Sequence, residues 1–366
     1  ARLLLMEKLD TEKFYPVLLT SHNAELAQEA KRRGLEVVIK PINPNFKRFP
    51  REELIKNPVL VFRTIIKCSR AAYRLANTLR DLEADILHPN DNLSRFVTII
   101  SQLWYRIPIV CHIDAEWNKV FTDFILRNLF VGRFDKLIAV SKRVEKLAKK
   151  SYFGRNKVVC INTGFDLEQF KNLDGQKIRD ELNLTSDVLL ISTLGKLIEF
   201  KGQSLVLEAL SQLEAKKKLP DYRYILIGDG PDKQFFKEKV QKLRLLDKVI
   251  FLGQRRDVST ILAGINILIQ PSFTEAFPLA VVEGLLTRCF VISSDVGGAS
   301  EILEQGRFGM LIPPKDLNAL EEALEKTMLM SPEHYQPQLK LAQETAMNKY
   351  GIDHSVKRVE EIYLSL

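Results

Sequence analysis

The second half of the chain alternates short apolar runs with longer segments in which apolar residues recur every three or four positions. The apolar runs, several of them rich in β-branched residues, predict strands at 188–194, 222–227, 249–252, 265–270, 290–293 and 310–312. The helical spacing predicts helices near 203–216, 231–245, 257–263, 278–287, 298–304 and 316–330. Strands that alternate with helices in this way indicate a doubly wound parallel sheet, which binds ligands at the C-terminal ends of its strands.

The first half follows the same pattern less regularly. Strands are expected at 14–20, 35–39, 85–88, 107–111, 136–141 and 158–161, with helices at 1–9, 24–33, 60–82, 96–105 and 142–150. Residues 41–58 hold four prolines and many basic residues, which indicates a surface loop. The tail from Pro337 to Leu366 is helical in pattern. The predicted fold class is therefore α/β, with two doubly wound domains.

Length and composition agree with two soluble domains. The chain has 366 residues, of which 46% are hydrophobic and 27% charged, and it contains no run of about 20 apolar residues that could span a membrane. Its cysteines are scattered without metal-site spacing, which favours a reduced, cytoplasmic chain: Cys68, Cys111, Cys160 and Cys289.

Charge is shared unevenly between the halves. Residues 1–160 carry 29 Lys and Arg against 17 Asp and Glu, a net charge of +12, whereas the whole chain carries +8. Arg63, Lys67, Arg70 and Arg74 form one basic stripe at helical spacing. A basic first half indicates a lipid-phosphate acceptor, an anionic membrane surface or nucleic acid as partner, or simply a solvated basic surface.

One stretch of the second half concentrates candidate chemistry. After the strand at 265–270 comes Pro271-Ser-Phe-Thr-Glu275-Ala-Phe277-Pro278-Leu279-Ala-Val-Val-Glu283. Pro278 is suited to begin a helix, so backbone N–H groups near Phe277, Pro278 and Leu279 should be free to bind an anion. Glu275 and Glu283 would flank that anion, and carboxylates there suit hydroxyl groups, which donate hydrogen bonds to them.

Three further loops follow predicted strands. Gly195-Lys196-Leu-Ile-Glu-Phe-Lys201-Gly202 brings two cations and a glycine turn to the end of a strand. Gly228-Asp-Gly-Pro231 permits a close backbone approach before a helix, and Asp295-Val-Gly-Gly-Ala-Ser-Glu301 opens another helix with paired glycines. Each loop alone is equally consistent with a plain turn or a solvated surface.

Together these motifs resemble the donor site of the retaining, nucleotide-sugar-dependent glycosyltransferases of family 4, which have the GT-B fold. The resemblance covers nearly the whole chain and is specific in residues 190–315. It implies two Rossmann-like doubly wound parallel-sheet domains that face a cleft. The acceptor-side domain would span 1–165, the donor domain 166–345, and a last helix at 346–366 would return to the first domain. Family members have a strand and a Gly-Gly loop before the helix at 1–9, so we expect the given sequence to lack that strand.

The resemblance also implies residue roles. Glu275 would contact the transferred sugar and Glu283 the ribose, while Lys196 and Lys201 stabilise the departing diphosphate. The nucleotide would further contact Gly195, Gly228, the backbone at Gln254 and Arg255, and the backbone at Phe277, Pro278 and Leu279. His112, with Asp114 and Glu116 close behind it, would end a first-domain strand near the transferred sugar, although a histidine at a strand end can also be purely structural. Lys196 stands where arginine is common in the family, so a compact ammonium group replaces a planar guanidinium group.

The implied function is retaining transfer of a hexosyl unit from a nucleotide-diphosphate sugar, with UDP-sugar favoured, to a glycan or lipid-linked acceptor. Two alternatives remain open: a nucleotide-sugar epimerase on the same fold, and a non-catalytic nucleotide-sugar binding subunit. We expect no metal and no cofactor, because lysine and arginine neutralise the phosphates in these enzymes. We expect no nucleic-acid partner, and a cytoplasmic protein with peripheral contact to an anionic membrane at its inner face.

Overall fold

The structure is a computed structural model that describes residues 2–22, 25–42, 58–113, 132–150, 156–216 and 219–366. The chain forms two compact units. Unit 1 comprises Ala1–Val140, Glu145–Gly164 and Ile352–Leu366, and unit 2 comprises Ser141–Val144 and Phe165–Gly351. The predictions that fall at 43–57, at Asp114 and at Glu116 lie outside the described residues.

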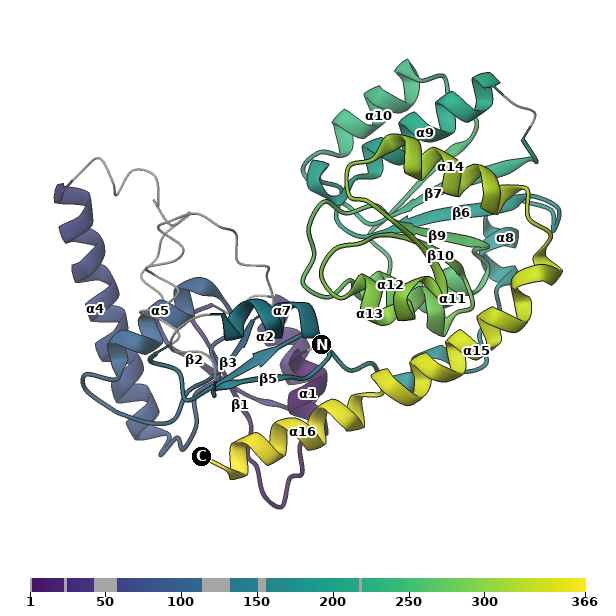
Figure 1. The fold of residues 1–366 in the computed structure, drawn as a ribbon. Coiled ribbons are helices and arrows are strands. Elements are labelled where there is room, and N and C mark those ends of the chain that lie inside the picture. The colour runs from purple at the N-terminus through teal and green to yellow at the C-terminus, as the bar shows by residue number, and fades with distance from the viewer. Residues whose placement is uncertain (1, 23–24, 43–57, 114–131, 151–155, 217–218) are drawn as a thin grey trace. The chain divides into compact units, whose positions relative to one another are not determined.

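Unit 2 is built on a six-stranded parallel sheet with the strand order β11-β10-β9-β6-β7-β8 (Figure 1). The strands are β6 Leu189–Leu194, β7 Tyr222–Ile227, β8 Val249–Gly253, β9 Ile267–Gln270, β10 Phe290–Ser294 and β11 Gly309–Ile312. All six strands expected in the second half are therefore present. The order runs outward from β6 to β8 on one side and from β9 to β11 on the other, so it reverses where β6 pairs with β9. Such a reversal leaves a crevice at the carboxyl ends of the two strands.

Helices cover both faces of this sheet (Figure 1). Those of unit 2 are α8 Gln176–Glu181, α9 Gln203–Lys216, α10 Lys233–Lys242, α11 Val258–Ala263, α12 Leu279–Leu286, α13 Ala299–Ile302, α14 Leu317–Met328 and α15 Pro332–Tyr350, with short 3₁₀ turns at Leu167–Phe170, Glu199–Lys201 and Glu304–Gly306. One core cluster joins the face of α9, α10 and α14 to the strands, for example through Leu207, Phe236, Leu320 and Ile191. The strands are apolar on both sides, as a sheet covered on both faces requires.

Unit 1 contains two parallel sheets within its described part: β1 Val17–Thr20 with β2 Glu36–Ile39, and β3 Val110–Ile113 with β4 Lys136–Ala139 and β5 Val158–Cys160. Its helices are α1 Arg2–Lys8, α2 Glu25–Arg32, α4 Pro58–Asp81, α5 Asn92–Ser101, α7 Lys142–Lys149, which begins in residues assigned to unit 2, and α16 Ile352–Leu364. Asp91 begins α5 with a capping box, since its side chain accepts from the Ser94 N–H and the Ser94 hydroxyl accepts from the Asp91 N–H.

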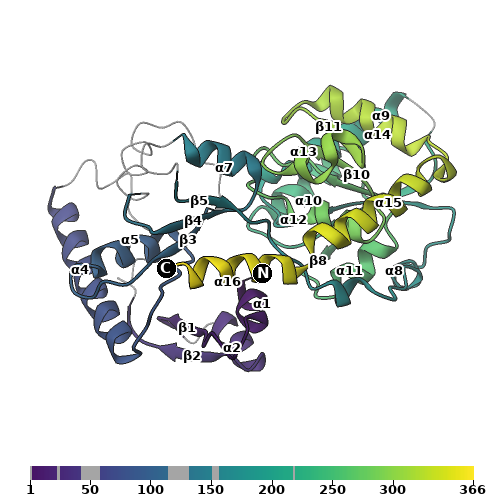
Figure 2. The same cartoon turned by 60° about the horizontal axis from the view of Figure 1, so that its bottom comes forward.

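Several elements differ from the sequence expectation. The strand predicted at 14–20 is β1 and begins at Val17, the strand predicted at 85–88 is reduced to an isolated bridge at Leu87, and the helix predicted at 96–105 lies at Asn92–Ser101. The predicted strand at 107–111 begins later, at Val110, because Pro108 has no N–H to donate to a ladder; only an isolated bridge joins Leu87 to Ile109. The predicted helical tail is interrupted at Gly351, which separates α15 from α16. Beyond the break, α16 lies beside α1 and buries Ile352, Val356 and Val359 in a unit 1 core cluster (Figure 2). In the described residues no helix has the length and apolar character needed to cross a bilayer.

Candidate functional site

Two loops meet at the point where the strand order of unit 2 reverses. One follows β6 and contains Lys196 and Lys201, and the other follows β9 and contains Glu275. The Phe273 N–H donates to the Phe200 carbonyl oxygen at 2.9 Å and so joins the loops. Gly202, with φ of 76°, approaches so closely that an added Cβ would lie 2.0 Å from the Pro271 carbonyl oxygen. A side chain at Gly202 would therefore push the two loops apart.

Glu275 is held by three donors that all reach the same carboxylate oxygen. Its Oε1 lies 2.5 Å from Lys201 Nζ, 2.9 Å from Ser272 Oγ and 3.0 Å from Gln270 Nε2. Gln270, the last residue of β9, also donates to Ser272 Oγ at 2.8 Å. The side chains of Lys201 and Glu275 are 23% and 15% exposed. The ion pair is thus partly shielded from water, where such a pair interacts more strongly than on a surface.

The pair keeps unused hydrogen-bonding capacity. Within the described part of the chain, Glu275 Oε2 accepts no hydrogen bond, and an ammonium group that donates once still has two N–H groups. Lys196, exposed on the same loop, makes no ion pair with a described residue. The arrangement can therefore offer a carboxylate oxygen to a hydroxyl group and several N–H donors to an anion at the same time.

The N-terminus of α12 follows directly in the chain. The helix begins at Leu279 after Pro278, which is the N-cap residue and provides no side-chain cap. The Val281 N–H donates to the Pro278 carbonyl oxygen at 3.1 Å, which leaves the N–H groups of Leu279 and Ala280 for another acceptor, and this turn carries no acidic side chain. Phe277 is buried and packs its ring against Tyr350 with centroids 5.7 Å apart. The turn is therefore rigidly held and suited to bind an anion.

Glu283 lies one turn further along α12. Its side chain makes no hydrogen bond to any described residue, and burial raises the pKa of its carboxyl group to about 7. The ionised carboxylate is costly in this apolar setting until a donor reaches it. A pair of hydroxyl groups, each of which donates a hydrogen bond, would lower that cost.

At the other predicted glycines, loops that follow neighbouring strands approach one another closely. Gly228 has φ of 135°, and an added Cβ would lie 2.0 Å from the Gly195 carbonyl oxygen. Gly195 in turn donates its N–H to Ile227 O at 2.9 Å, and Gly228 donates to Gly253 O at 2.8 Å. The loops after β6, β7 and β8 therefore form one backbone-bonded layer. At Gly297, in the loop after β10, an added Cβ would lie 2.3 Å from the Glu275 carbonyl oxygen.

Gln254 and Arg255 follow β8, as predicted. The Arg255 guanidinium group donates to Glu181 on α8, at 2.6 and 2.9 Å, and to Asp257, at 2.9 and 2.7 Å. These carboxylates raise the pKa of the guanidinium group. The side chain is thus occupied in fixing the turn, which leaves the backbone at these two residues to contact a ligand.

His112 belongs to unit 1, where it is the third residue of β3 and is 6% exposed. Its Nδ1 lies 2.6 Å from Nε2 of His88, and its carbonyl oxygen accepts from Arg95 at 2.7 Å. Burial, the neighbouring His88 and the positive charges of Arg2 and Arg95 hold the pKa of His112 well below its usual value. His112 is therefore a neutral imidazole at neutral pH.

Sequence reasoning missed the residues that hold these groups. Gln270 had a signal, because it is a polar residue at the C-terminal end of an apolar strand, and Ser272 follows it. His88 and Tyr363 had none, because they meet across 275 sequence positions. In the described residues no group of three or more His, Cys, Asp or Glu side chains could hold a metal ion. Independence from metal stays a prediction.

Comparisons with known proteins agree with this fold. Residues 19–169 match the family model described as Glycosyltransferase Family 4, and residues 174–345 match Glycosyl transferases group 1. The Anabaena HepE structure in complex with UDP and glucose superposes with a TM-score of 0.82, covering 100% of this chain and 95% of that chain at 20% identity. WaaG, described as a glycosyltransferase involved in lipopolysaccharide biosynthesis, superposes with a TM-score of 0.70 over 99% of this chain and 94% of that chain at 15% identity.

Curated relatives extend the likeness in sequence. A putative teichuronic acid biosynthesis glycosyltransferase of Bacillus subtilis is 31% identical over 68% of this chain and 62% of the relative. The Escherichia coli UDP-Gal:alpha-D-GlcNAc-diphosphoundecaprenol alpha-1,3-galactosyltransferase is 22% identical over 83% of this chain and 81% of the relative. Fold and loops together define a GT-B glycosyltransferase. Both halves of the chain belong to the family 4 type, which confirms the resemblance seen in the sequence.

Proposed function

We propose that this glycosyltransferase moves a hexosyl unit from a UDP-sugar to a lipid-linked or glycan acceptor with retention of anomeric configuration. The observation that carries the proposal is the pairing of Lys201 with Glu275 at 2.5 Å where the strand order reverses. One half of this pair suits a diphosphate and the other half suits sugar hydroxyls. Relatives support the choice of donor and acceptor, since one is described as using UDP-Gal and a diphosphoundecaprenol acceptor.

The donor would lie along three of the described features. The first-turn N–H groups of α12, with Lys196 and Lys201, would bind the diphosphate, and Glu283 would accept hydrogen bonds from the ribose. Glu275 Oε2 would accept from a hydroxyl of the transferred sugar. Gln270 and Ser272 hold Oε1 and so fix the direction of Oε2.

The transfer step would be a front-face displacement. The bond between the anomeric carbon and the phosphate oxygen breaks while the acceptor hydroxyl forms its bond on the same face. The leaving phosphate oxygen takes the acceptor proton, so no separate base and no covalent enzyme intermediate are needed. Negative charge develops on the diphosphate, and the ammonium groups of Lys196 and Lys201 would stabilise it most in the transition state. This step needs no metal ion, because the lysines neutralise the charge.

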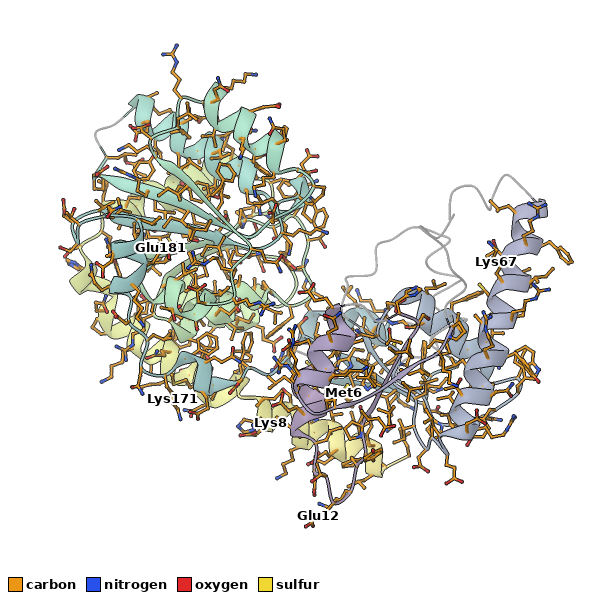
Figure 3. The ribbon with its side chains drawn as sticks, turned by 180° about the vertical axis from the view of Figure 1, so that it is seen from behind. Met6, Lys8, Glu12, Lys67, Lys171 and Glu181 are labelled. Carbon is orange, nitrogen blue, oxygen red and sulfur yellow. The ribbon has the colours of Figure 1, made fainter. Side chains whose placement is uncertain are left out.

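A lipid-linked acceptor requires access to a membrane, and α4 of unit 1 has a suitable surface. Its N-terminal half extends past the neighbouring helix α5 (Figure 1). Phe62, Ile65 and Tyr73 share one face of α4 and are 65%, 53% and 50% exposed. The basic stripe of the sequence analysis lies on the adjacent face, and Lys67 is one of its exposed members (Figure 3).

A helix with exposed apolar side chains beside a row of cations fits an anionic lipid surface. Just after α5, Leu103 is 74% exposed and Trp104 packs edge-on against Tyr73 with ring centroids 5.8 Å apart. We propose that this α4 face rests on the cytoplasmic side of the membrane. Peripheral contact of this kind would bring the acceptor to the enzyme.

Product analysis tests the proposed activity. The protein is incubated with UDP-glucose, UDP-galactose or their N-acetyl forms, with and without an undecaprenyl-diphosphate-linked sugar. An α-linked product that forms only with acceptor, in the presence of EDTA, supports the proposal. Epimerised or hydrolysed donor without acceptor would instead identify a donor-modifying enzyme. UDP binding without turnover for any acceptor would identify a binding subunit.

A further inference from the structure

Three polar side chains of unit 1 form a line in which His112 is buried and His88 and Tyr363 are half-buried. The hydroxyl oxygen of Tyr363, on α16, lies 2.6 Å from His88 Nδ1, and His88 Nε2 lies 2.6 Å from His112 Nδ1. Tyr363 also packs its ring edge-on against His88 and against Phe14. The helix α16 is thereby connected to His112, the third residue of β3.

The two imidazole rings meet edge to edge. Their planes are inclined by only 13° with centroids 4.7 Å apart, and the 2.6 Å separation of the nitrogens is shorter than the thickness of an aromatic stack. One proton must therefore lie between His88 and His112. Burial and the charges of Arg2 and Arg95 lower the pKa of His88 to about 3, so both rings are neutral and each carries a single N–H.

The protons of the hydrogen-bonded line Tyr363–His88–His112 can be placed in two ways. In the first, Tyr363 donates to His88 Nδ1, His88 Nε2–H donates to His112 Nδ1, and the proton of His112 is on Nε2. In the second, every direction is reversed, and the Tyr363 hydroxyl proton then needs another acceptor. Within the described residues, His88 is the only hydrogen-bond partner of that hydroxyl. In the first arrangement the phenol hydroxyl donates to an imidazole nitrogen, a strong acceptor, and the one unpaired proton is the His112 Nε2–H. The second arrangement makes the phenol oxygen, a poor acceptor, take the His88 proton and leaves the hydroxyl proton without a described acceptor, so we adopt the first.

We propose that Tyr363 and His88 are positioning residues that fix His112 as the Nε2–H tautomer, so that His112 presents a neutral hydrogen-bond donor to the substrate. The inference rests on the proposed function for the role of His112 in transfer, but not for the tautomer itself. A neutral donor suits a sugar hydroxyl or a phosphate oxygen, and the fixed tautomer prevents His112 from acting as a base at this nitrogen. The role resembles that of other groups that hold a catalytic histidine in one orientation.

The tautomer can be measured without any activity. In protein labelled with ¹⁵N-histidine, long-range ¹H–¹⁵N correlation spectra distinguish Nδ1–H from Nε2–H imidazole. We call the line Tyr363–His88–His112 the relay. The relay predicts that both His88 and His112 are neutral Nε2–H imidazoles from pH 5 to pH 8. A predominant Nδ1–H form at His112, or a charged ring in that pH range, would overturn the inference whatever reaction the protein catalyses.

Variants connect the tautomer to turnover. Tyr363→Phe keeps the ring contacts and removes only the hydroxyl, so it should shift His112 to a mixture of tautomers and lower kcat about tenfold, with the KM for donor nearly unchanged. His88→Gln preserves an acceptor and a donor in the same order and should retain more activity than His88→Leu. Tyr15→Phe, which loses a hydrogen bond to Glu36 in the same unit, is the matched control.

The outcomes separate the relay from the function. Equal kcat values for Tyr363→Phe and wild type, with an unchanged His112 spectrum, would contradict the relay. A confirmed Nε2–H tautomer in a protein that transfers no sugar would leave the relay intact and refute the proposed function alone.

Discussion

Lys201 Nζ lies 2.5 Å from Glu275 Oε1, and this ion pair connects the loops that follow β6 and β9. These strands are neighbours in the sheet although 72 residues, 195–266, separate the end of β6 at Leu194 from the start of β9 at Ile267. The pair therefore marks the point where the two halves of the doubly wound sheet meet. Its position gives the site both a cation for a leaving group and a carboxylate for a sugar.

Glu275 should matter for transfer and not for nucleotide affinity. Glu275→Gln removes the charge while keeping the size of the side chain, so we expect transfer to fall about 100-fold or more. The Kd for UDP should change less than about threefold, or tighten slightly, because a negative charge near the diphosphate is lost. Coupled assays for kcat and calorimetry for Kd measure the two effects. An equal loss in both would assign Glu275 to the nucleotide instead.

Lys201 should matter for nucleotide affinity as well as for transfer. Lys201→Ala removes a cation from the diphosphate and leaves Glu275 uncompensated, so the Kd for UDP should rise about 10- to 100-fold. Lys216→Ala is the matched control, because Lys216 also pairs with a glutamate, Glu321, but at the far end of α9. If both lysine variants bind UDP like the wild type, the diphosphate is bound elsewhere.

Glu283 predicts how donor binding depends on pH. Burial raises its pKa to about 7, and ribose hydroxyls donate more strongly to the ionised carboxylate than to the protonated group. Binding should therefore release a proton, and the affinity for UDP-glucose should rise about tenfold between pH 6 and pH 8. UDP-glucose is the better ligand for this titration because its diphosphate does not titrate in that range. In Glu283→Gln the profile should become flat, and a wild-type profile that falls with pH would refute the assignment.

The raised pKa of the Glu283 carboxyl group should also make the stability of the fold depend on pH. Its pKa in the folded protein is raised above the unfolded value of 4.5, so the folded state binds more protons between these values. Stability should therefore decrease as pH rises from about 4.5 to 7 for this group. Chemical denaturation of wild type and Glu283→Gln at several pH values checks the sign, because the difference between them should grow toward pH 7 in favour of the variant.

Gly202 is predicted to be required by contact and not only by its backbone conformation. Gly202→Ala would place a Cβ 2.0 Å from Pro271 O, whereas Gly253, with a similar φ of 70°, has no atom within 4 Å of an added Cβ. We expect Gly253→Ala to cost about 1 kcal/mol of stability and Gly202→Ala clearly more, with lost activity. Thermal unfolding of the two variants measures this. Equal melting temperatures would show that the loops can separate freely.

The α4 face predicts binding to lipid vesicles. Wild-type protein should sediment with vesicles that contain phosphatidylglycerol and much less with pure phosphatidylcholine, and raised salt should weaken binding. Replacing Arg63, Lys67, Arg70 and Arg74 by Gln should abolish the preference for anionic lipid, and Phe62→Ser with Ile65→Ser should weaken binding to both. Turnover of a short soluble acceptor should be unchanged in these variants. Equal sedimentation of wild type and the Gln variant would refute the membrane face.

Much of the fold follows from local pattern. A strand that is covered on both faces is apolar throughout, and a helix that covers a sheet has apolar residues at every third or fourth position. The six strands of unit 2 and the loops with Gly195, Gly228 and Glu275 were predictable for that reason. The late start of β3 depended on Pro108, whose missing N–H outweighed the apolar run. The break at Gly351 had a glycine as its signal, but the burial of Ile352 in unit 1 was not visible in the helical pattern.

Contacts between distant residues were beyond local reasoning. Nothing near His112 in sequence indicates that its ring nitrogen meets His88, 24 positions away, or that Tyr363 continues the line. Likewise the glycine motifs suggested close approach to a ligand, whereas Gly202, Gly228 and Gly297 approach other loops of the protein itself. These contacts depend on which strands become neighbours, and that is decided by topology.

The most direct measurement is a crystal structure of the protein soaked with an intact UDP-sugar. The account predicts that the diphosphate contacts Lys201 Nζ and the first-turn N–H groups of α12, that the ribose contacts Glu283, and that a hydroxyl of the sugar donates to Glu275 Oε2. Nucleotide bound at another edge of the sheet, or a Glu275 carboxylate without contact to the sugar, would contradict it.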